Sequence, residues 1–506
     1  MRQFTPFLSK SKYLSGLQCH KLLWYYYNAK DQIPAFDAQT QAIFDQGHLV
    51  GSLAKKLYPD GIEIAGAAND FGKILELSKE AVTDATKCVP PNRVQHRRPL
   101  FEAAFKSGSA FARADILNPV GKNDWEIIEV KSSTEVKDVN LHDLALQRYA
   151  YEGAGLSITR CFVLHINNEY VRQGAVDPKL LFTKTDVTED VRDLLKGVPG
   201  NLGTMLEVIR QKSSPDIAIG SHCSDPYGCP LQEVCWKFLA EHNPLTLNYL
   251  KKEKAFELIH DGHLDIRRLP ASVSLSDKQD IQVKALRSGK AHVDKEGIRG
   301  FLGQIEYPTC YLDFETFGTA IPMYDDVRPY EQIPFQFSLH IVESEGKKPR
   351  HESFLADGTS DPRPEILKRL KTLLGEKGSI VAYNASFEKD KLSKACEVFK
   401  DYAKWCKSIE PRFVDLLTPF KSFHYYHPDQ RGSASIKAVL PALTGKSYEG
   451  MEISEGGTAS LEYLRVTYGE VEEKERRRVR GELEKYCTMD TEGMVLIVDE
   501  LGRLTR

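Results

Sequence analysis

The chain has 506 residues, of which 41% are hydrophobic and 27% are charged, and its 68 basic against 71 acidic side chains give a net charge of −3. These values are ordinary for globular proteins and exclude a mostly disordered chain, a collagen-like fibre and a coiled-coil rod. The near-neutral balance also excludes a protein that coats nucleic acid through its overall charge, so any such contact would need local basic patches.

Membrane and export signals are missing from the sequence pattern. No run approaches the roughly 20 consecutive apolar residues that a membrane-spanning helix needs, and residues 1–16 lack the apolar core of a signal peptide. We therefore expect a cytoplasmic protein without membrane contact. In a reducing compartment the 10 cysteines are not expected to form a disulfide framework, so their positions raise the question of metal binding.

Three regions follow one another along the chain. Residues 1–245 begin and end with cysteines, residues 246–304 read as a helical linker, and residues 305–506 open with a strand that follows a proline. Short apolar strands alternate with longer helical patterns, which predicts a mixed α/β fold. We expect strands within 126–130, 161–166, 309–314, 378–384 and 412–417, and helices over 201–211 and 481–501.

The first candidate site lies in a predicted hairpin. Asp115 belongs to its first strand, and Glu129 and Lys131 belong to its second. Residues two apart on a strand point to the same face, so the hairpin would bring all three together. Two carboxylates suit a hard divalent cation such as Mg²⁺, and a lysine can neutralise charge that develops in a reaction. Alternating charges are equally typical of an exposed strand face, so this pattern alone leaves both interpretations open.

Residues around the hairpin favour the metal site. Gln147 and Tyr151 are four apart in a helical segment and share one face. His48 lies upstream in a second helical segment, and Glu102 opens the first strand of the set.

This order of a helix-borne His, Glu, Asp, (D/E)-x-K and QxxxY resembles the RecB-like branch of PD-(D/E)XK nucleases. The resemblance spans roughly residues 5 to 240 and implies a restriction-endonuclease-like domain. By this resemblance the metal ligands are His48, Asp115 and Glu129, with the carbonyl of Val130. The catalytic residues that it implies are Lys131, Glu129, Asp115, Gln147, Tyr151 and Glu102.

Four cysteines form a second pattern, one early and three late in the first region. Zinc ligands usually come in pairs two to four residues apart, whereas the late cysteines here follow C-x5-C-x5-C. Four thiolates can hold a [4Fe–4S] cluster, which would close a loop of about 200 residues as a cross-link does. Zinc and free buried thiols are the alternatives. The four residues are Cys19, Cys223, Cys229 and Cys235.

The one-early, three-late arrangement resembles AddB-type and CRISPR-adaptation iron–sulfur nucleases, although the first two late cysteines are further apart here. The other cysteines show no such pattern, and we expect them to be buried thiols. They are Cys88, Cys161, Cys310, Cys396, Cys406 and Cys487.

Acidic residues form a third pattern in the last region. Asp313 and Glu315 lie two apart on a predicted strand, and Tyr486 and Asp490 lie four apart on a predicted helix. Acids that converge from separate elements can hold two divalent ions about 4 Å apart, one for the attacking water and one for the leaving oxygen. A tyrosine beside them can orient the water.

The order D-x-E, N-x-x-x-acid and Y-x-x-x-D resembles the DnaQ-like, DEDDy-type 3′–5′ exonucleases of the RNase H-like fold, over about residues 305 to 506. One position departs from the family, because Glu388 stands where an Asp is usual, and Asp390 could substitute for it. Asp415 resembles a supporting Asp of the family. The metal ligands that this resemblance implies are Asp313, Glu315, Glu388 and Asp490, with Tyr486 as the catalytic tyrosine.

The two patterns together resemble an uncharacterised bacterial family that joins such units. The resemblance implies a metal-dependent deoxyribonuclease and exonuclease that hydrolyses DNA phosphodiesters with Mg²⁺ or Mn²⁺, in DNA repair or in defence against foreign DNA. The sequence lacks a G-x-x-x-x-G-K-[ST] phosphate loop, so unwinding would need a helicase partner. The alternatives are an RNA-processing exonuclease and a nucleic-acid-binding scaffold with an inactive centre.

Overall fold

The computed structural model describes residues 6–35, 37–64, 70–87 and 97–506, so the predicted thiol Cys88 lies outside the described residues. The chain forms two compact units, one of Met1–Lys237 with Thr319–Tyr330 and one of Phe238–Gly318 with Glu331–Arg506. The stretch 246–304, predicted as a linker, belongs to the second unit in this division. No helix in the described ranges has the length and apolar character to cross a membrane.

The first unit is built on a six-stranded mixed sheet with the strand order β1-β2-β3-β4-β5-β6. The pairs β1–β2 and β4–β5 are parallel, and the other neighbours are antiparallel. Its strands are β1 (Ile62–Glu63), β2 (Leu100–Ser107), β3 (Ala110–Val120), β4 (Asp124–Lys131), β5 (Ser157–Ile166) and β6 (Phe182–Asp186). Its helices are α1 (Lys10–Gln18), α2 (His20–Asn28), α3 (Ala38–Ala54), α4 (Phe71–Lys87), α5 (Asp138–Gly153), α6 (Pro178–Leu181), α7 (Thr188–Leu195), α8 (Val198–Arg210) and α9 (Gln232–Cys235).

The strands of this sheet bury both of their faces. In β4, Trp125 and Ile127 join a core with α5, whereas Ile128 joins a second core with α3. Because side chains alternate along a strand, Glu129 and Lys131 point to the face that α5 covers. The alternation in β4 therefore directs the predicted site residues toward the helix that carries the QxxxY pattern.

The second unit contains a five-stranded mixed sheet with the order β10-β9-β8-β11-β12 and a two-stranded sheet of β13 and β7. Strand β9 is antiparallel to both neighbours, while β8, β11 and β12 are parallel. Its strands are β7 (His292–Val293), β8 (Thr309–Phe317), β9 (Ile333–Val342), β10 (Arg350–Leu355), β11 (Ile380–Ala382), β12 (Phe413–Asp415) and β13 (Tyr425–Tyr426). Its helices are α10 (Lys252–His260), α11 (Asp277–Ser288), α12 (Lys295–Leu302), α13 (Arg363–Leu373), α14 (Ser386–Val398), α15 (Ala403–Ile409), α16 (Thr418–Lys421), α17 (Ile436–Thr444), α18 (Gly456–Tyr468) and α19 (Glu473–Thr505).

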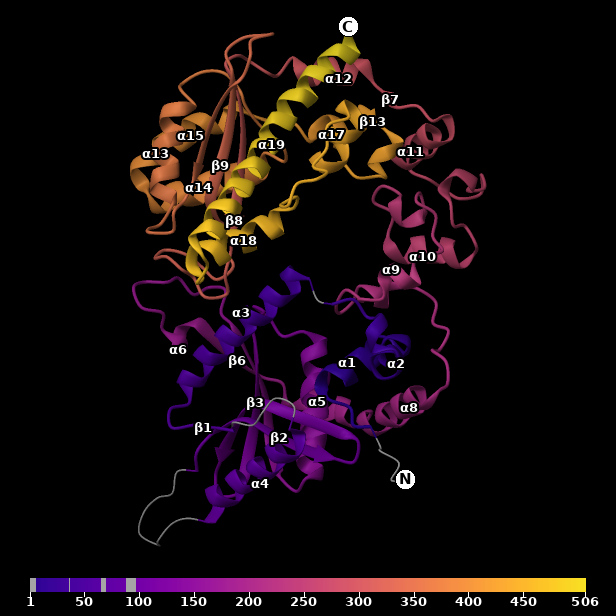
Figure 1. The fold of residues 1–506 in the computed structure, drawn as a ribbon, viewed down its shortest axis with the longest axis vertical. Coiled ribbons are helices and arrows are strands. Elements are labelled where there is room, and N and C mark those ends of the chain that lie inside the picture. Colours follow the sequence, from indigo (N-terminus) through magenta and orange to yellow (C-terminus); the bar gives the residue numbers. More distant parts are fainter. Residues whose placement is uncertain (1–5, 36, 65–69, 88–96) are drawn as a thin grey trace. The chain divides into compact units, whose positions relative to one another are not determined.

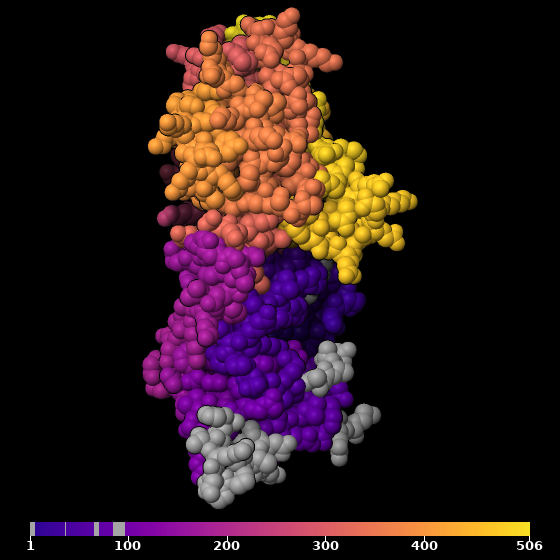
Figure 2. Space-filling view, turned by 90° about the vertical axis from the view of Figure 1, so that its left-hand side faces the viewer, coloured from indigo at the N-terminus to yellow at the C-terminus, as the bar shows by residue number. Residues whose placement is uncertain are grey.

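Helices cover both faces of the five-stranded sheet. Figure 1 shows α13, α14 and α15 on one side and the long helix α19 on the other. Every residue of β9 is buried, as a strand covered on both faces requires. The C-terminal segment, yellow in Figure 2, reaches the surface of this unit, where Arg477 of α19 pairs with Glu473 at 2.9 Å.

The secondary-structure predictions are confirmed. The five predicted strands correspond to β4, β5, β8, β11 and β12, and the two predicted helices to α8 and α19. The fold is mixed α/β, as expected.

The cysteine prediction needs one correction. Cys396 of α14 and Cys406 of α15 form a disulfide with a Cα–Cα distance of 6.7 Å, so they are not thiols. Sequence alone did not reveal that these two short helices pack side by side. Cys161, Cys310 and Cys487 are buried free thiols, as predicted.

Candidate functional site

The predicted hairpin exists and brings its carboxylates together. Pairing of β3 with β4 begins at Ile116 opposite Ile128. Just beyond this point Asp115 Oδ2 accepts a hydrogen bond of 2.7 Å from the backbone N–H of Val130. Asp115 therefore lies beside Glu129, as predicted from the spacing.

Glu129 is the centre of a bonded cluster in the first unit. Its carboxylate accepts hydrogen bonds of 2.7 Å from Lys131 and of 2.7 Å from the Gln147 side-chain amide. Sequence analysis missed two further members, Lys10 and Asp143. Lys10 Nζ lies 2.7 Å from Glu129 and 3.5 Å from Asp143, and Lys131 Nζ lies 3.0 Å from Asp143.

Two lysines and two carboxylates thus alternate around a ring, which we call the unit 1 ring (Lys10, Glu129, Lys131 and Asp143). Asp143 precedes Gln147 by one helical turn, so the pattern could have been extended to it. No local sequence pattern indicates the contact of Lys10 with Glu129, because the two residues are 119 positions apart.

The charges in the unit 1 ring shift one another's pKa values. Burial, with help from Asp115 and Asp143, raises the pKa of Glu129 to about 7. Burial also acts to raise the pKa of Asp143, but Lys10 and Lys131 outweigh it and hold that pKa below its usual value. The two lysines therefore hold down the pKa of Asp143 and limit the rise in the pKa of Glu129.

Replacing Lys10 with Met is expected to lower the free energy of unfolding by about 3 kcal/mol, because it removes one of the two cations that pair with the buried carboxylates of Glu129 and Asp143. Urea unfolding at pH 7.5 measures the change. Lys12→Met is the matched control, since Lys12 lies on the same helix but over the Tyr26 ring instead. Equal effects of the two substitutions would contradict a structural role for Lys10 in the ring.

Glu102 and His48 are two further residues that the sequence predicts for this site. Glu102 has a φ of 58° within β2, a backbone conformation that is uncommon outside glycine. It pairs with Arg113 at 3.0 Å and Lys55 at 3.4 Å, and burial together with Asp115 raises its pKa. His48 is exposed on α3 and makes no hydrogen bond to the acids within the described part of the chain.

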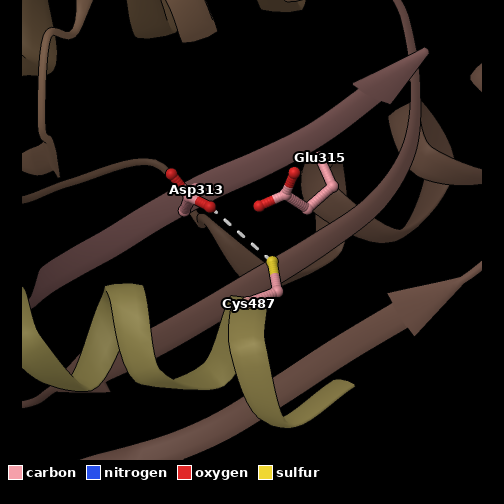
Figure 3. Close-up of side chains that lie close together, drawn as sticks. All are labelled: Asp313, Glu315 and Cys487. Carbon is pink, nitrogen blue, oxygen red and sulfur yellow. Dashed lines mark hydrogen bonds between the residues drawn. The ribbon is translucent and has the colours of Figure 1, made fainter. Parts of the chain in front are cut away.

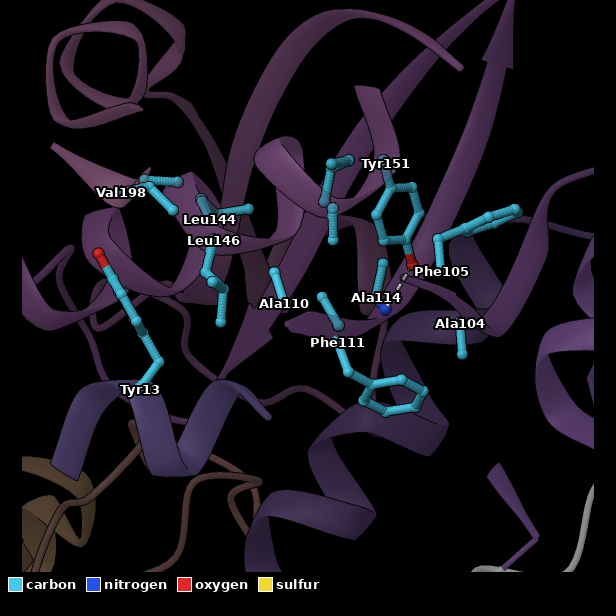
Figure 4. Close-up of a cluster of buried hydrophobic side chains, with 14 of the residues drawn as sticks. Tyr13, Ala104, Phe105, Ala110, Phe111, Ala114, Leu144, Leu146, Tyr151 and Val198 are labelled. Atoms are coloured by element: carbon cyan, nitrogen blue, oxygen red, sulfur yellow. Dashed lines mark hydrogen bonds between the residues drawn. The ribbon is translucent and has the colours of Figure 1, made fainter. Parts of the chain in front are cut away.

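Tyr151 supports the strands instead of contacting the ring. Its hydroxyl donates to the carbonyl of Ala103. It also accepts a 2.9 Å hydrogen bond from the N–H of Ala114, which Figure 4 shows. The tyrosine thus joins β2 to β3 next to Asp115. These hydrogen bonds hold β2 and β3 together, and the catalytic role that the resemblance implies for Tyr151 stays a prediction.

A cavity of about 310 Å³ opens beside Asp115. This volume is at the lower end of the range of small-ligand sites. Its walls combine two cations, two acids, two hydroxyls and an apolar side. The lining residues are Lys10, Arg113, Glu102, Asp115, Ser9, Ser11, Phe71, Ile74 and Phe111.

The four patterned cysteines come together in the first unit. They line one small cavity, and burial and the other three thiols raise the pKa of Cys229 to about 11. Gln18, next to Cys19, donates hydrogen bonds of 2.8 and 2.6 Å to the carbonyls of His222 and Tyr227. These bonds hold the early and late cysteine segments side by side.

A second group of acids lies in the other unit. Asp313 and Glu315 of β8 face Cys487 of α19 (Figure 3), and one ligand atom from each lies within 4.8 Å of the others. The Cys487 thiol donates to Asp313 Oδ2 at 3.7 Å. This is the only such group of three among the residues that the structure describes. Sequence analysis had assigned Cys487 no role beyond packing.

Asp490 joins these acids from the next turn of α19. Its Oδ1 accepts a hydrogen bond from Tyr448, a residue that sequence analysis missed. Burial raises the pKa of Asp490 to about 6, against hydrogen bonds from Tyr448 and Tyr486 and the charge of Lys437. Lys437 Nζ lies 5.2 Å from the Tyr486 ring centroid, so a cation lies next to this group.

Glu388 is the fourth acid, and Asp390 does not replace it. Glu388 is 2% exposed, and its Oε2 has no hydrogen-bond partner among the described residues. Asp390 instead pairs with Lys391 at 2.7 Å and Lys394 at 3.1 Å on the surface. Asp415 accepts hydrogen bonds of 2.9 and 3.0 Å from the backbone N–H groups of Asn384 and Leu417.

We call Asp313, Glu315, Glu388 and Asp490 the unit 2 acids. Burial and the Asp490 charge raise the pKa of Glu315 to about 8, and burial and Asp415 raise that of Glu388 to about 8. Burial, Asp490 and Glu315 raise the pKa of Asp313 well above its usual value. Such crowding of buried acids stores repulsion that a bound cation would relieve.

These shifts predict how stability depends on pH without metal. Because the folded-state pKa values of Glu315 and Glu388 exceed their usual 4.5, their protonation stabilises the fold at low pH, and this contribution is lost as pH rises toward about 8. We expect the metal-free unfolding temperature to fall by about 5 °C or more between pH 5 and 8. Scanning calorimetry measures it, and a Glu315→Gln, Glu388→Gln double variant with an unchanged pH dependence would contradict this assignment.

Comparison with known proteins gives a partial match to one family. Residues 310–435 match the model of a family described as "Domain of unknown function (DUF2779)". This range includes Asp313, Glu315 and Glu388 but ends before Tyr486 and Asp490.

Two curated relatives come from Mycoplasma. The chain is 25% identical over 233 residues to "Uncharacterized protein MG366 homolog" of Mycoplasma pneumoniae. The aligned region covers 41% of this chain and 35% of that protein. The chain is 26% identical over 282 residues to "Uncharacterized protein MG366" of Mycoplasma genitalium. The aligned region covers 51% of this chain and 42% of that protein. The match thus spans less than half the length of either relative.

Proposed function

We propose that the protein is a metal-dependent nuclease with two centres, one in each unit, that hydrolyses DNA phosphodiesters. The observation that carries the proposal is the convergence of the unit 2 acids. They come from three separate elements, β8, α14 and α19, and their pKa values are raised by burial and mutual repulsion. Burying four acids close together is costly when they are ionised, and a bound cation would offset that cost.

The unit 2 acids fit hard divalent ions such as Mg²⁺ or Mn²⁺, since carboxylate oxygens are their preferred ligands and Glu388 offers a buried oxygen without a partner. A divalent ion held there would polarise a phosphoryl oxygen and lower the pKa of a bound water. Tyr486 shares a helix face with Asp490 and would orient that water. Lys437 would offset charge that develops on the phosphate. In this proposal the unit has a DnaQ-like, RNase H-like fold.

In the first unit, Asp115 and Glu129 offer oxygens for a divalent ion, and Lys131 stands next to them for the developing charge. The adjoining cavity offers Lys10 and Arg113 to a phosphate and apolar ring faces to a base. These features support a PD-(D/E)XK-type centre that takes nucleic acid. The role of His48 as a metal ligand stays a prediction.

The four cysteines fit a [4Fe–4S] cluster better than zinc. Tetrahedral zinc with bonds of about 2.3 Å holds its sulfurs about 3.8 Å apart. No three of these sulfurs, all of which lie in described segments, are within 4.8 Å of one another. A four-iron cube is larger than a single ion, so it needs the wider spacing.

A cleavage assay tests the proposal. Labelled single-stranded DNA, duplex DNA and RNA are incubated with Mn²⁺ and the wild type, Lys131→Ala, Asp313→Ala or the double variant. Lys122→Ala and Asp401→Ala, at exposed positions of the same two units, are the matched controls. We expect each site variant to remove one cleavage activity and the double variant to remove both.

Two other outcomes would change the function. Cleavage of RNA alone would favour an RNA-processing exonuclease, because fold does not fix the polymer. Binding of nucleic acid without cleavage would favour a scaffold with inactive centres. DNA is preferred here because the iron–sulfur nucleases that the first unit resembles act on DNA.

A further inference from the structure

Cys487 gives the unit 2 acids a sulfur neighbour that a site for hard ions does not need. Its side chain is fully buried, and its Sγ belongs to the same group of ligand atoms as the carboxylates of Asp313 and Glu315 (Figure 3). The thiol comes from α19 and the acids from β8, so the fold brings together residues that are 174 positions apart in the sequence.

The distance between the ligand atoms of Asp313 and Cys487 is compatible with a zinc ion. A tetrahedral zinc ion with bonds of about 2.1 Å to oxygen and about 2.3 Å to sulfur separates the two ligand atoms by about 3.6 Å. The distance between Asp313 Oδ2 and Cys487 Sγ is 3.7 Å. A zinc ion bound to both atoms would replace the hydrogen bond that the thiol now makes to Asp313.

Asp490 does not complete the group in place of the thiol. The Tyr448 hydroxyl donates a hydrogen bond to Asp490 Oδ1. Among the described residues, Asp490 is not part of the group whose ligand atoms lie within 4.8 Å of one another. Glu388 lies outside this group as well, but its charge acts on Asp313 and Glu315, and its buried oxygen without a described partner is a polar atom that a nearby cation would satisfy.

We propose that Asp313, Glu315 and Cys487 form a mixed oxygen–sulfur site that binds zinc in preference to magnesium. Thiolate ligands favour zinc, whereas carboxylates and water suit magnesium. Three protein ligands leave one position of the tetrahedron open, as in catalytic zinc sites. Binding forms a zinc–sulfur bond, breaks the S–H bond and releases the proton to solvent. Zinc would thus occupy one ion position of the proposed unit 2 centre. The use of that ion in hydrolysis, but not its binding, rests on the proposed function.

Cobalt(II) is the spectroscopic probe for this site. The full chain is titrated with Co²⁺, and the spectrum of Cys487→Ser is subtracted from that of the wild type, so that the four-cysteine site cancels. We expect a thiolate-to-cobalt charge-transfer band in the difference spectrum. Asp313→Asn is expected to weaken the binding that produces this band by about 10-fold or more, and excess Mg²⁺ should not displace the cobalt.

The matched control is Cys310→Ser. It removes a different buried thiol, one on β8, and should leave the difference band intact. Cys487→Ala is the second variant if the serine disturbs folding, which circular dichroism monitors. Identical cobalt spectra for the wild type and both Cys487 variants would overturn the site, as would full affinity in Asp313→Asn. Because the readout is absorption, the band can be present in a chain that cleaves nothing, and cleavage can occur without the band.

Discussion

Replacing Asp313 with Asn is expected to abolish the Mn²⁺-dependent cleavage that the second unit supplies, with a loss of about 10²–10³-fold or more. Asp313 lies on the central strand β8 next to Glu315, and its carboxylate is one of the few oxygens in the group that can bind a cation. Asparagine keeps the shape of the side chain but removes its charge. Initial rates on labelled single-stranded DNA measure the change, with Asp401→Asn as the control.

The same substitution is expected to stabilise the metal-free protein. The pKa of Asp313 is raised well above its usual value by burial, Asp490 and Glu315, so its ionised form costs folding free energy at pH 8. Removing the ionisable group should increase the free energy of unfolding by more than about 1.4 kcal/mol, the equivalent of one pKa unit. Lower activity with higher stability is typical of functional sites that store repulsion.

The two measurements separate a site from a structural acid. If Asp313 only stabilised the fold, its replacement would lower stability, and activity would fall with the folded fraction. A variant that keeps full activity, or one that is less stable than the wild type without metal at pH 8, would contradict the assignment of Asp313.

The sequence predicted the parts of each site that short spacing controls. Glu129 with Lys131 and Asp313 with Glu315 follow from the two-residue period of a strand. The hairpin that brings Asp115 to Val130 followed from a turn between two apolar runs. In each case the side chains that meet are close in sequence or belong to neighbouring strands, so local pattern was sufficient.

The residues that sequence analysis missed come from contacts between distant segments. Lys10 bonds to Glu129 across 119 residues, and Tyr448 bonds to Asp490 from a loop with no periodic pattern. The contacts of Tyr151 were also not evident from its spacing. Tyr151 lies one turn beyond Gln147 on α5, and its hydroxyl bonds to the backbone of β2 and β3.

Replacing Cys19 with Ser is expected to destabilise the first unit far more than replacing Cys235 with Ser. Cys19 is the only early member of the four-cysteine group, so a cluster joined through it closes a loop of about 200 residues, which the chain-entropy model equates with about 5 kcal/mol. Without Cys19 the remaining cysteines lie within one short segment, and the long loop opens.

Without Cys235 the link between Cys19 and the late segment can persist through Cys223 and Cys229. The hydrogen bonds of Gln18 to His222 and Tyr227 remain in both variants, so the difference between them isolates the link through Cys19. Anaerobically purified protein is assayed for iron, sulfide and zinc, and urea unfolding of each variant is followed by circular dichroism.

Cys161→Ser controls for the loss of a buried thiol, since Cys161 is fully buried in the core of the same unit and lines no part of the cysteine cavity. We expect this control to keep its iron and sulfide. Equal destabilisation by Cys19→Ser and Cys235→Ser would show that no long loop is closed. Wild-type protein without stoichiometric iron and sulfide or zinc would leave the four thiols as packing residues, and the first unit would then owe its stability to its sheet and the unit 1 ring.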